Sequence, residues 1–316
     1  MARPDFRLGI DLGGTKIHAV VIDPKGKVVG TSRTATKVEK GYAMVLERIA
    51  DTAREAVTTA GAKWKDIGAV GLGVPGPVDV KKGLILMAPN LGWEPTSIGN
   101  DLRASIDRQV VVGNDVNYGA LGEVAYGCAS DVSSAFMAFV GTGLGGAYVH
   151  RGRVINGAHG YAGEIGHLLA PFGDAMCGCG RRGCLETTSS RSGIVRMIRE
   201  AVARGQTAKV PMEGPIKSSA LRDALQANCP VVTAAVEQCA KSLAWGLSTI
   251  AQVVDPRVFV LGGGVAEALG AAFAEQVGNH LAGSSVLYTR NKPDIRLAVL
   301  GDDAVAIGAA VAAGEE

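Results

Sequence analysis

Each half of the chain contains a strand, a glycine turn and a second strand. In the first half, the apolar segment Phe6–Asp11 meets Gly13-Gly14-Thr15, and Ile17–Ile22 follows. In the second half, Ala135–Val140 leads into another glycine-rich turn, and Ala147–His150 follows. Short apolar runs on both sides of a turn indicate strands, and their recurrence indicates an internal repeat. The pattern predicts an α/β protein whose two lobes place both turns at one cleft.

Further elements follow from hydrophobic periodicity. Apolar residues recur at helical spacing over Tyr42–Ala60 and over the long run Val231–Val254. Ile67–Val74 and Val258–Leu261 are continuous apolar runs that predict buried strands. Asp303–Ala313 is predicted to be a terminal helix of small residues that packs back on the first lobe.

Composition and charge restrict the class of protein. Hydrophobic residues make up 47% and charged residues 20%, which is typical of a globular chain. Lysine and arginine number 32 and aspartate and glutamate 30, so a net charge of +2 argues against nucleic acid or an anionic membrane as the main partner. No apolar run approaches the ~20 residues of a membrane helix, and Met1–Leu8 lacks the apolar core of a signal peptide. We therefore expect a cytoplasmic protein.

The glycine turns can bind phosphate. Backbone N–H groups that converge in a glycine-rich turn form a site for an anion without any charged side chain. Asp11, at the end of the first strand, is placed to hold a hydrated Mg²⁺. Neither turn fits the GxxxxGK[ST] pattern of the P-loop. Each turn alone could be only a tight hairpin, but Gly262-Gly263-Gly264 follows a third strand, and the three together favour a nucleotide site.

A cluster of cysteines gives a more specific signal. Cys177, Cys179 and Cys184 lie within eight residues, and His167 precedes them by ten positions. Three thiolates and one imidazole satisfy a tetrahedral zinc ion, and a site with four protein ligands is structural. We therefore predict a structural zinc site. The other three cysteines are isolated and are predicted to be small buried hydrophobic residues.

Two carboxylates lie beside this cluster in the sequence. Glu164 precedes His167 by three residues, and Glu186 follows Cys184 by two. A carboxylate accepts several hydrogen bonds and suits the recognition of neighbouring hydroxyl groups. A solvated charge or a helix cap is the alternative for each, and for Glu186 it stays open.

Asn114-Asp115 follows a short β-branched strand and precedes a helical segment. A carboxylate at the end of a strand could accept the proton of an attacking alcohol. Asp115 is equally suited to cap the following helix. Both roles are compatible only if Asn114 or another group makes the cap.

These motifs resemble those of bacterial sugar kinases of the ROK family (repressors, open reading frames and kinases), and the resemblance runs over nearly the whole chain. Cys177–Glu186 follows the family's CxCGxxGCxE signature, and Glu164–His167 follows its ExGH motif. Asp11–Lys16 matches the DLGGTK phosphate motif. Val116 stands where the family usually has Ala. The remaining matching motifs are Gly73-Val74-Pro75-Gly76, Pro89-Asn90 and Asn114-Asp115.

The resemblance implies an actin-like ATPase (ribonuclease H-like) fold with two lobes and a cleft between them. It also implies ATP-dependent phosphorylation of a hexose at its 6-hydroxyl, most simply of glucose, with Asp115 as the general base. The implied sugar-binding residues are Gly76, Asn90, Asn114, Asp115, Glu164, His167 and Glu186. The implied residues for ATP and Mg²⁺ are Asp11, Gly13, Gly14, Thr15, Lys16, Gly141, Thr142, Gly143, Gly262, Gly263 and Gly264. His167 would serve both zinc and sugar.

The predicted small lobe comprises residues 1–117 plus about 303–316, and the predicted large lobe comprises residues 118–302 with the zinc-binding loop. A homodimer or homotetramer is expected from the family. A kinase for N-acetylhexosamine, mannose, fructose or allose is the alternative within the same class. From another class, a non-catalytic sugar-sensing regulator stays open. A repressor is disfavoured because the first phosphate strand begins by residue 6, which leaves no room for a helix-turn-helix domain before it.

Overall fold

The computed structural model describes residues 6–284, 286–288 and 292–314. Its strands are β1 Phe6–Leu12, β2 Lys16–Ile22, β3 Val28–Ala35, β4 Ile67–Val74, β5 Val78–Asp79, β6 Leu84–Ile85, β7 Gln109–Asn114, β8 Ser134–Val140, β9 Leu144–His150, β10 Arg153–Val154, β11 Val258–Gly262 and β12 Ile295–Leu297. Its α-helices are α1 Tyr42–Thr59, α2 Ile98–Ile106, α3 Asp115–Tyr126, α4 Arg191–Ala203, α5 Ser218–Gln226, α6 Pro230–Val254, α7 Gly263–Ser284 and α8 Ala304–Ala313. The strands and helices predicted from apolar patterning are all present, with ends that shift by a few residues.

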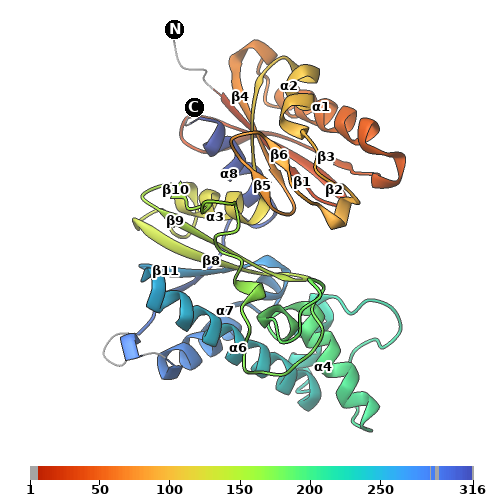
Figure 1. Cartoon of the computed structure of the whole chain (residues 1–316), viewed down its shortest axis with the longest axis vertical. Coiled ribbons are helices and arrows are strands. Elements are labelled where there is room, and N and C mark those ends of the chain that lie inside the picture. The colour runs from red at the N-terminus through yellow and green to blue at the C-terminus, as the bar shows by residue number, and fades with distance from the viewer. Residues whose placement is uncertain (1–5, 285, 289–291, 315–316) are drawn as a thin grey trace. The chain divides into compact units, whose positions relative to one another are not determined.

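The first sheet has the order β3-β2-β1-β4-β7. Strands β1, β4 and β7 run parallel, whereas β2 is antiparallel to both of its neighbours. The carboxyl ends of β1, β4 and β7 therefore meet at one edge, and Asp11 and Asn114 lie in the last residues of two of these strands. Helix α1 packs along β3 and β2, as Figure 1 shows.

Helix α8 packs on the first sheet, which confirms the prediction for the terminal helix. The contact is close because α8 is built almost wholly of small residues and faces glycines of β1 and β4. A Cβ atom on Gly71 would lie only 1.9 Å from the carbonyl oxygen of Ala309. Glycine at this position is thus required for the helix to lie directly against the sheet.

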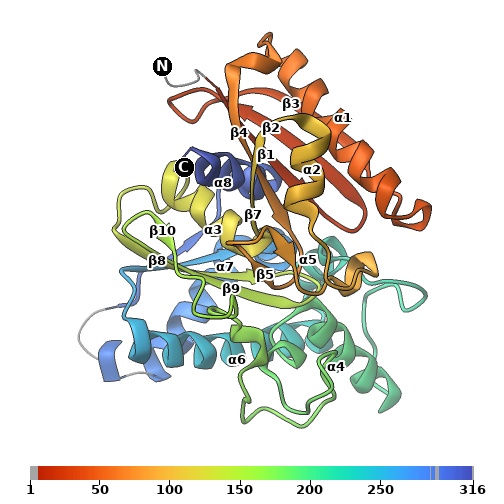
Figure 2. The same ribbon diagram turned by 45° about the horizontal axis from the view of Figure 1, so that its top comes forward.

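The second sheet has the order β10-β9-β8-β11-β12, and β8, β11 and β12 are parallel. In both sheets a glycine turn joins the central strand to the strand beside it, so the predicted repeat is confirmed at the level of topology. Figure 2 shows α4 and α6, which pack against each other, and α6 also packs against α7.

The chain divides into two compact units. Unit 1 comprises residues 1–131, 148–162 and 302–316, and unit 2 comprises residues 132–147 and 163–301. This division differs from the predicted boundary at residue 117, because α3 packs against α8 and thereby stays with the first sheet. Within the described part of the chain, no helix combines the length and the apolar character needed to cross a bilayer.

Three short 3₁₀ helices carry predicted site residues. Asn90 lies in Pro89–Leu91 of unit 1. In unit 2, His167 ends Ile165–His167, and Glu186 lies in Leu185–Thr187. Short 3₁₀ turns of this kind are common in connecting segments.

Candidate functional site

In unit 1, the glycine turn between β1 and β2 contains the predicted phosphate motif. The N–H of Gly13 donates to the carbonyl of Lys16 at 2.9 Å, and the Thr36 hydroxyl donates to the carbonyl of Gly13 at 2.7 Å. A Cβ atom on Gly14 would lie 3.2 Å from the carbonyl oxygen of Asn90. The two hydrogen bonds close this hairpin. The hairpin lies beside Asn90, one of the predicted sugar-binding residues.

Asn114, and not Asp115, caps helix α3. Its side-chain oxygen accepts a hydrogen bond from the N–H of Asn117 at 3.1 Å. Its side-chain nitrogen donates to the carbonyl of Gly76 at 3.1 Å and to the carboxylate of Asp115 at 3.0 Å. The N–H of Val116 donates to the same carboxylate at 2.8 Å. Asp115 is thus held in place and is not used as the helix cap.

The carboxyl group of Asp11 is shifted toward its neutral form. Its desolvation in the folded chain raises its pKa to about 7, and the negative charge of Asp115 adds to the rise. No other described residue forms a hydrogen bond or an ion pair with this carboxylate in the structure. A carboxylate that lacks a protein partner fits Mg²⁺, which is commonly bound through one or two carboxylates together with substrate phosphates.

In unit 2, Glu186 connects the second glycine turn to the cysteine cluster. Its Oε2 accepts a hydrogen bond from the N–H of Leu144 at 2.9 Å, and its Oε1 lies 3.6 Å from Sγ of Cys177. A Cβ atom on Gly143 would lie 2.2 Å from Oε2, so only glycine leaves room for this carboxylate. Glu186 therefore does not act as a helix cap, and both of its carboxylate oxygens contact neighbouring residues.

The same glycine turn is bound to the start of helix α4. The N–H of Arg191 donates to the carbonyl of Gly141 at 2.9 Å, and the Arg191 guanidinium donates to the hydroxyl of Thr142 at 2.5 Å. The hydroxyl of Ser192 donates to the carbonyl of Thr142 at 2.8 Å. Arg191 and Ser192 thus belong to the site, although their sequence context gave no signal of it.

The four predicted zinc ligands lie together. Potential ligand atoms of His167, Cys177, Cys179 and Cys184 all lie within 4.8 Å of one another. Sγ of Cys179 is 3.6 Å from Sγ of Cys184, and Sγ of Cys177 is 3.8 Å from Nδ1 of His167. Sulfur atoms bound to one tetrahedral zinc ion lie about 3.8 Å apart, given Zn–S bonds of about 2.3 Å. The donor set and its spacing therefore fit zinc.

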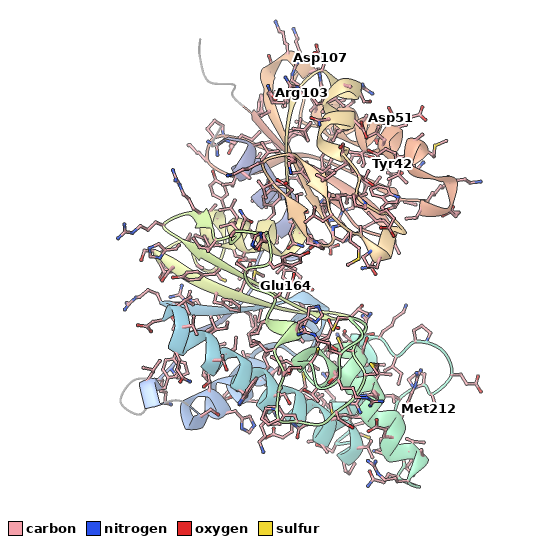
Figure 3. All side chains as sticks on the ribbon, in the orientation of Figure 1. Tyr42, Asp51, Arg103, Asp107, Glu164 and Met212 are labelled. Carbon is pink, nitrogen blue, oxygen red and sulfur yellow. The ribbon has the colours of Figure 1, made fainter. Side chains whose placement is uncertain are left out.

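The thiols of the cluster differ in their surroundings. Burial raises the pKa of Cys177 to about 12, whereas hydrogen bonds from the backbone N–H and the side chain of Arg181 lower the pKa of the exposed Cys179 to about 6. Nε2 of His167 lies 3.9 Å from Oε2 of Glu164; Glu164 is labelled in Figure 3. A carboxylate beside the second nitrogen of a ligating imidazole orients the ring.

The third glycine run borders a pocket in unit 2 with a volume of about 600 Å³. Gly262 ends β11, and Gly263 and Gly264 begin α7. The hydroxyl of Ser218 is buried, lies 3.7 Å from the position of a Cβ atom on Gly264, and has no hydrogen-bond partner among the described residues. Polar and charged residues that line this pocket are Arg191, Lys217, Ser218, Ser219 and Glu267. The pocket is thus lined both by the start of α4 and by the glycine run.

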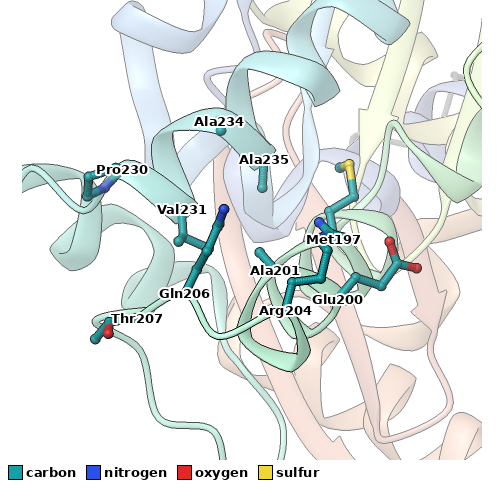
Figure 4. A pocket seen from close by; sticks show the side chains of 10 residues that line it. All are labelled: Met197, Glu200, Ala201, Arg204, Gln206, Thr207, Pro230, Val231, Ala234 and Ala235. Atoms are coloured by element: carbon teal, nitrogen blue, oxygen red, sulfur yellow. The ribbon is translucent and has the colours of Figure 1, made fainter.

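A second hollow of unit 2, with a volume of about 720 Å³, lies between α4 and α6 and is shown in Figure 4. Its lining includes Met197, Arg204 and Val231. None of the predicted site residues lines it, so it plays no part in the proposed chemistry.

A sequence model of the ROK family matches residues 7–316. The chain belongs to the ROK family. A glucokinase from Halalkalibacterium halodurans is 30% identical to this ROK protein over 306 residues, which cover 95% of the chain and 92% of that glucokinase. A putative xylose repressor from a Caldicellulosiruptor species is 32% identical over 278 residues, which cover 85% of the chain and 68% of the repressor.

The structure of this ROK protein is also similar to solved structures. A ROK family glucokinase from Streptomyces griseus, in complex with glucose and AMPPNP, superposes with a TM-score of 0.81 and 29% identity, over 98% of this chain and 100% of that one. This similarity confirms the predicted fold class, an α/β protein of the actin-like ATPase type.

Proposed function

We propose that this ROK protein transfers the γ-phosphoryl group of ATP to the 6-hydroxyl of a hexose, with Asp115 as the general base. The observation that carries the proposal is that Asn114, and not Asp115, caps helix α3. Asn114 makes the helix cap, so capping does not compete with the proposed role of the Asp115 carboxylate as acceptor of an alcohol proton. The N–H of Val116 and the amide of Asn114 hold that carboxylate in one orientation.

The residues around Asp11 suit the phosphate donor. Phosphoryl transfer depends on positioning and on neutralising the charge of the phosphates more than on covalent help from the protein. The N–H groups of Gly14 and Thr15 would bind phosphate oxygens, while Gly13, whose N–H donates to the carbonyl of Lys16, closes the turn around them. The ammonium group of Lys16 would neutralise phosphate charge. Asp11 would hold Mg²⁺, and the ion would supply further neutralisation of the phosphate charge.

The nucleoside is assigned to the pocket beside Gly264. The pocket has the volume of a small-molecule site. Arg191, which is hydrogen-bonded to the Gly141–Gly143 turn, and Lys217 would supply positive charge for the phosphates, and Ser218 borders the pocket beside Gly264. This assignment adds three residues to those predicted for ATP.

The hexose would be recognised by planar polar side chains. Asn90 and Asn114 of unit 1, and Glu164, His167 and Glu186 of unit 2, offer the donors and acceptors that hydroxyl groups require. Glucose is the favoured substrate, because these residues are all present and because glucokinases are among the relatives. Zinc in the cluster would fix His167 and the turn that bears Glu186 before the sugar binds.

The proposal is tested by supplying the purified protein with Mg²⁺, ATP or polyphosphate, and a panel of hexoses and amino sugars. We expect ATP-dependent release of ADP that is fastest with glucose. Faster phosphorylation of N-acetylglucosamine, N-acetylmannosamine, mannose, fructose or allose would change the substrate but keep the reaction. Absence of a sugar phosphate with every member of the panel would overturn the proposal.

A sugar-sensing regulator is the second candidate, because a putative xylose repressor is similar over most of this chain. Such a protein would bind a sugar but release no ADP in the same assay. Retention of Asp11, Asp115 and both glycine turns favours the enzyme.

A further inference from the structure

Two aspartates that precede helix α8 bind three basic side chains of the neighbouring strands. Oδ2 of Asp302 lies 2.9 Å from Nζ of Lys16 and 3.1 Å from Nη1 of Arg33. Oδ1 of Asp303 lies 2.6 Å from Nε2 of the buried His18 and 3.3 Å from Nη2 of Arg33. The network therefore links α8 to β2 and β3 within unit 1.

The ordinary role of an acidic residue at this position does not explain the network. Asp303 occupies the N-cap position of α8, yet its side chain accepts no hydrogen bond from the helix. An aspartate at an N-cap normally makes that bond. Exposed ion pairs such as Asp302 with Lys16 contribute only about 0–1 kcal/mol to stability. The presence of the two aspartates is better explained by the basic side chains that they bind.

Those side chains lie on the face of the sheet that carries Asp11. Asp11 pairs with His18 across β1 and β2, and His18 pairs with Arg33 across β2 and β3. Residues directly opposite each other point to the same face and have Cβ atoms about 5 Å apart. Lys16 precedes His18 by two residues and shares its face. Lys16 and Arg33 therefore lie on the same face as Asp11, and their basic groups can reach its carboxylate.

We propose that Asp302 and Asp303 are positioning residues that hold Lys16 and Arg33 at the start of α8 and so leave the carboxylate of Asp11 available for a hydrated divalent cation. The inference rests on the proposed function, because it assigns that cation to the nucleotide. Without the two aspartates, the cationic groups would pair with Asp11. They would then compete with Mg²⁺ for its oxygen atoms and screen its charge.

The test measures binding of ADP by calorimetry over a range of Mg²⁺ concentrations, together with the Mg²⁺ dependence of turnover. Asp302→Asn and the double variant D302N/D303N remove the negative charges that hold Lys16 and Arg33, while they preserve the shape of the substituted side chains. We expect the Mg²⁺ concentration for half-maximal ADP binding to rise on the order of threefold to tenfold in the double variant. Binding of ADP without Mg²⁺ should not weaken.

A matched control and a second-site variant separate this role from a structural one. Asp51→Asn removes the same charge from an exposed ion pair with Arg54 on α1, which packs on the other face of the sheet; Asp51 is labelled in Figure 3. This control should keep the wild-type Mg²⁺ dependence. Adding Arg33→Gln to D302N/D303N removes a competing cation and should restore much of the Mg²⁺ dependence.

Two outcomes would overturn the inference. One is a double variant with the same Mg²⁺ dependence as the wild type. The other is a weakened double variant that Arg33→Gln does not rescue, since that result indicates a structural role. If the wild type itself binds no ADP in the presence of Mg²⁺, the proposed function fails, which is distinguishable from failure of this inference alone.

Discussion

Asp11 and Asp115 stand at the carboxyl ends of two strands that flank β4; burial raises the pKa of Asp11, and the charge of Asp115 adds to the rise. Two carboxylates that share one edge of a sheet repel each other and favour a bound cation between or beside them. The arrangement therefore lowers the stability of the folded protein when no cation is bound, and it favours the binding of a cation. Stability and function are expected to oppose each other at Asp11.

The first prediction concerns pH. Because folding raises the pKa of Asp11 from 3.8 to about 7, the folded state binds this proton more tightly than the unfolded state does. The contribution of Asp11 to stability is therefore most favourable below pH 4 and is lost as the pH rises through 7. In buffer without Mg²⁺, Asp11→Asn should raise the free energy of unfolding at pH 8 by about 1–2 kcal/mol relative to wild type.

The comparison is made by chemical denaturation of both proteins at several values between pH 4 and pH 8. The advantage of the variant should shrink as the pH falls, and the variant should lose catalysis. Asp23→Asn, in the turn after β2, controls for removal of a carboxylate outside the site. An advantage of equal size at every pH would show that Asp11 is not the group that titrates.

The second prediction assigns the base. Asp115→Asn should lower kcat by about 10²–10⁴-fold, because the amide cannot accept the proton of the sugar alcohol. Binding of sugar and nucleotide, measured by calorimetry, should be nearly unchanged. Val116→Ala, which restores the residue usual in the family, should leave kcat near the wild-type value. Substantial turnover by Asp115→Asn would remove this residue from the role of base.

The third prediction links the metal to the sugar. Cys179→Ser should lower the bound zinc, measured by atomic absorption, and the affinity for glucose together. The physical reason is that the cluster positions His167 and, through Cys177, Glu186. Cys128→Ser makes the same chemical change outside the cluster and should retain both properties. Complete loss of zinc with unchanged binding of glucose would contradict the proposed role of the metal.

The fourth prediction concerns space beside the second glycine turn. Gly143→Ala should weaken binding of glucose and lower turnover, because the new methyl group would displace the carboxylate of Glu186. At Gly141 the nearest atom to a new Cβ lies 4.0 Å away, so Gly141→Ala should cost less. Steady-state kinetics of both variants would measure the difference. Equal losses would indicate that the turn itself, and not Glu186, is sensitive to the substitution.

Local patterns in the sequence predict much of this fold. The apolar run of β4 and the helical spacing of α1 and α6 each give an element whose ends agree within about two residues, the usual uncertainty of such boundaries. The cysteine spacing likewise predicts a cluster that the structure assembles from one segment and a histidine ten residues before it. These features depend on residues that are near one another in the chain.

Features that depend on distant residues could not be predicted in the same way. The pocket beside Gly264 combines Arg191 and Ser218, and no spacing in the sequence relates the three. The division of roles between Asn114 and Asp115 is set by the backbone at the start of α3, for which both residue types are suitable. The membership of α3 in unit 1 depends on its packing against α8, nearly two hundred residues later.

The central claim is most directly tested by ³¹P nuclear magnetic resonance of the product formed from glucose, ATP and Mg²⁺ by the purified protein. The account predicts a phosphomonoester whose phosphorus couples to the two protons on C6 of the sugar, with ADP formed in equal amount. A phosphate attached at another carbon, or release of inorganic phosphate alone, would contradict it.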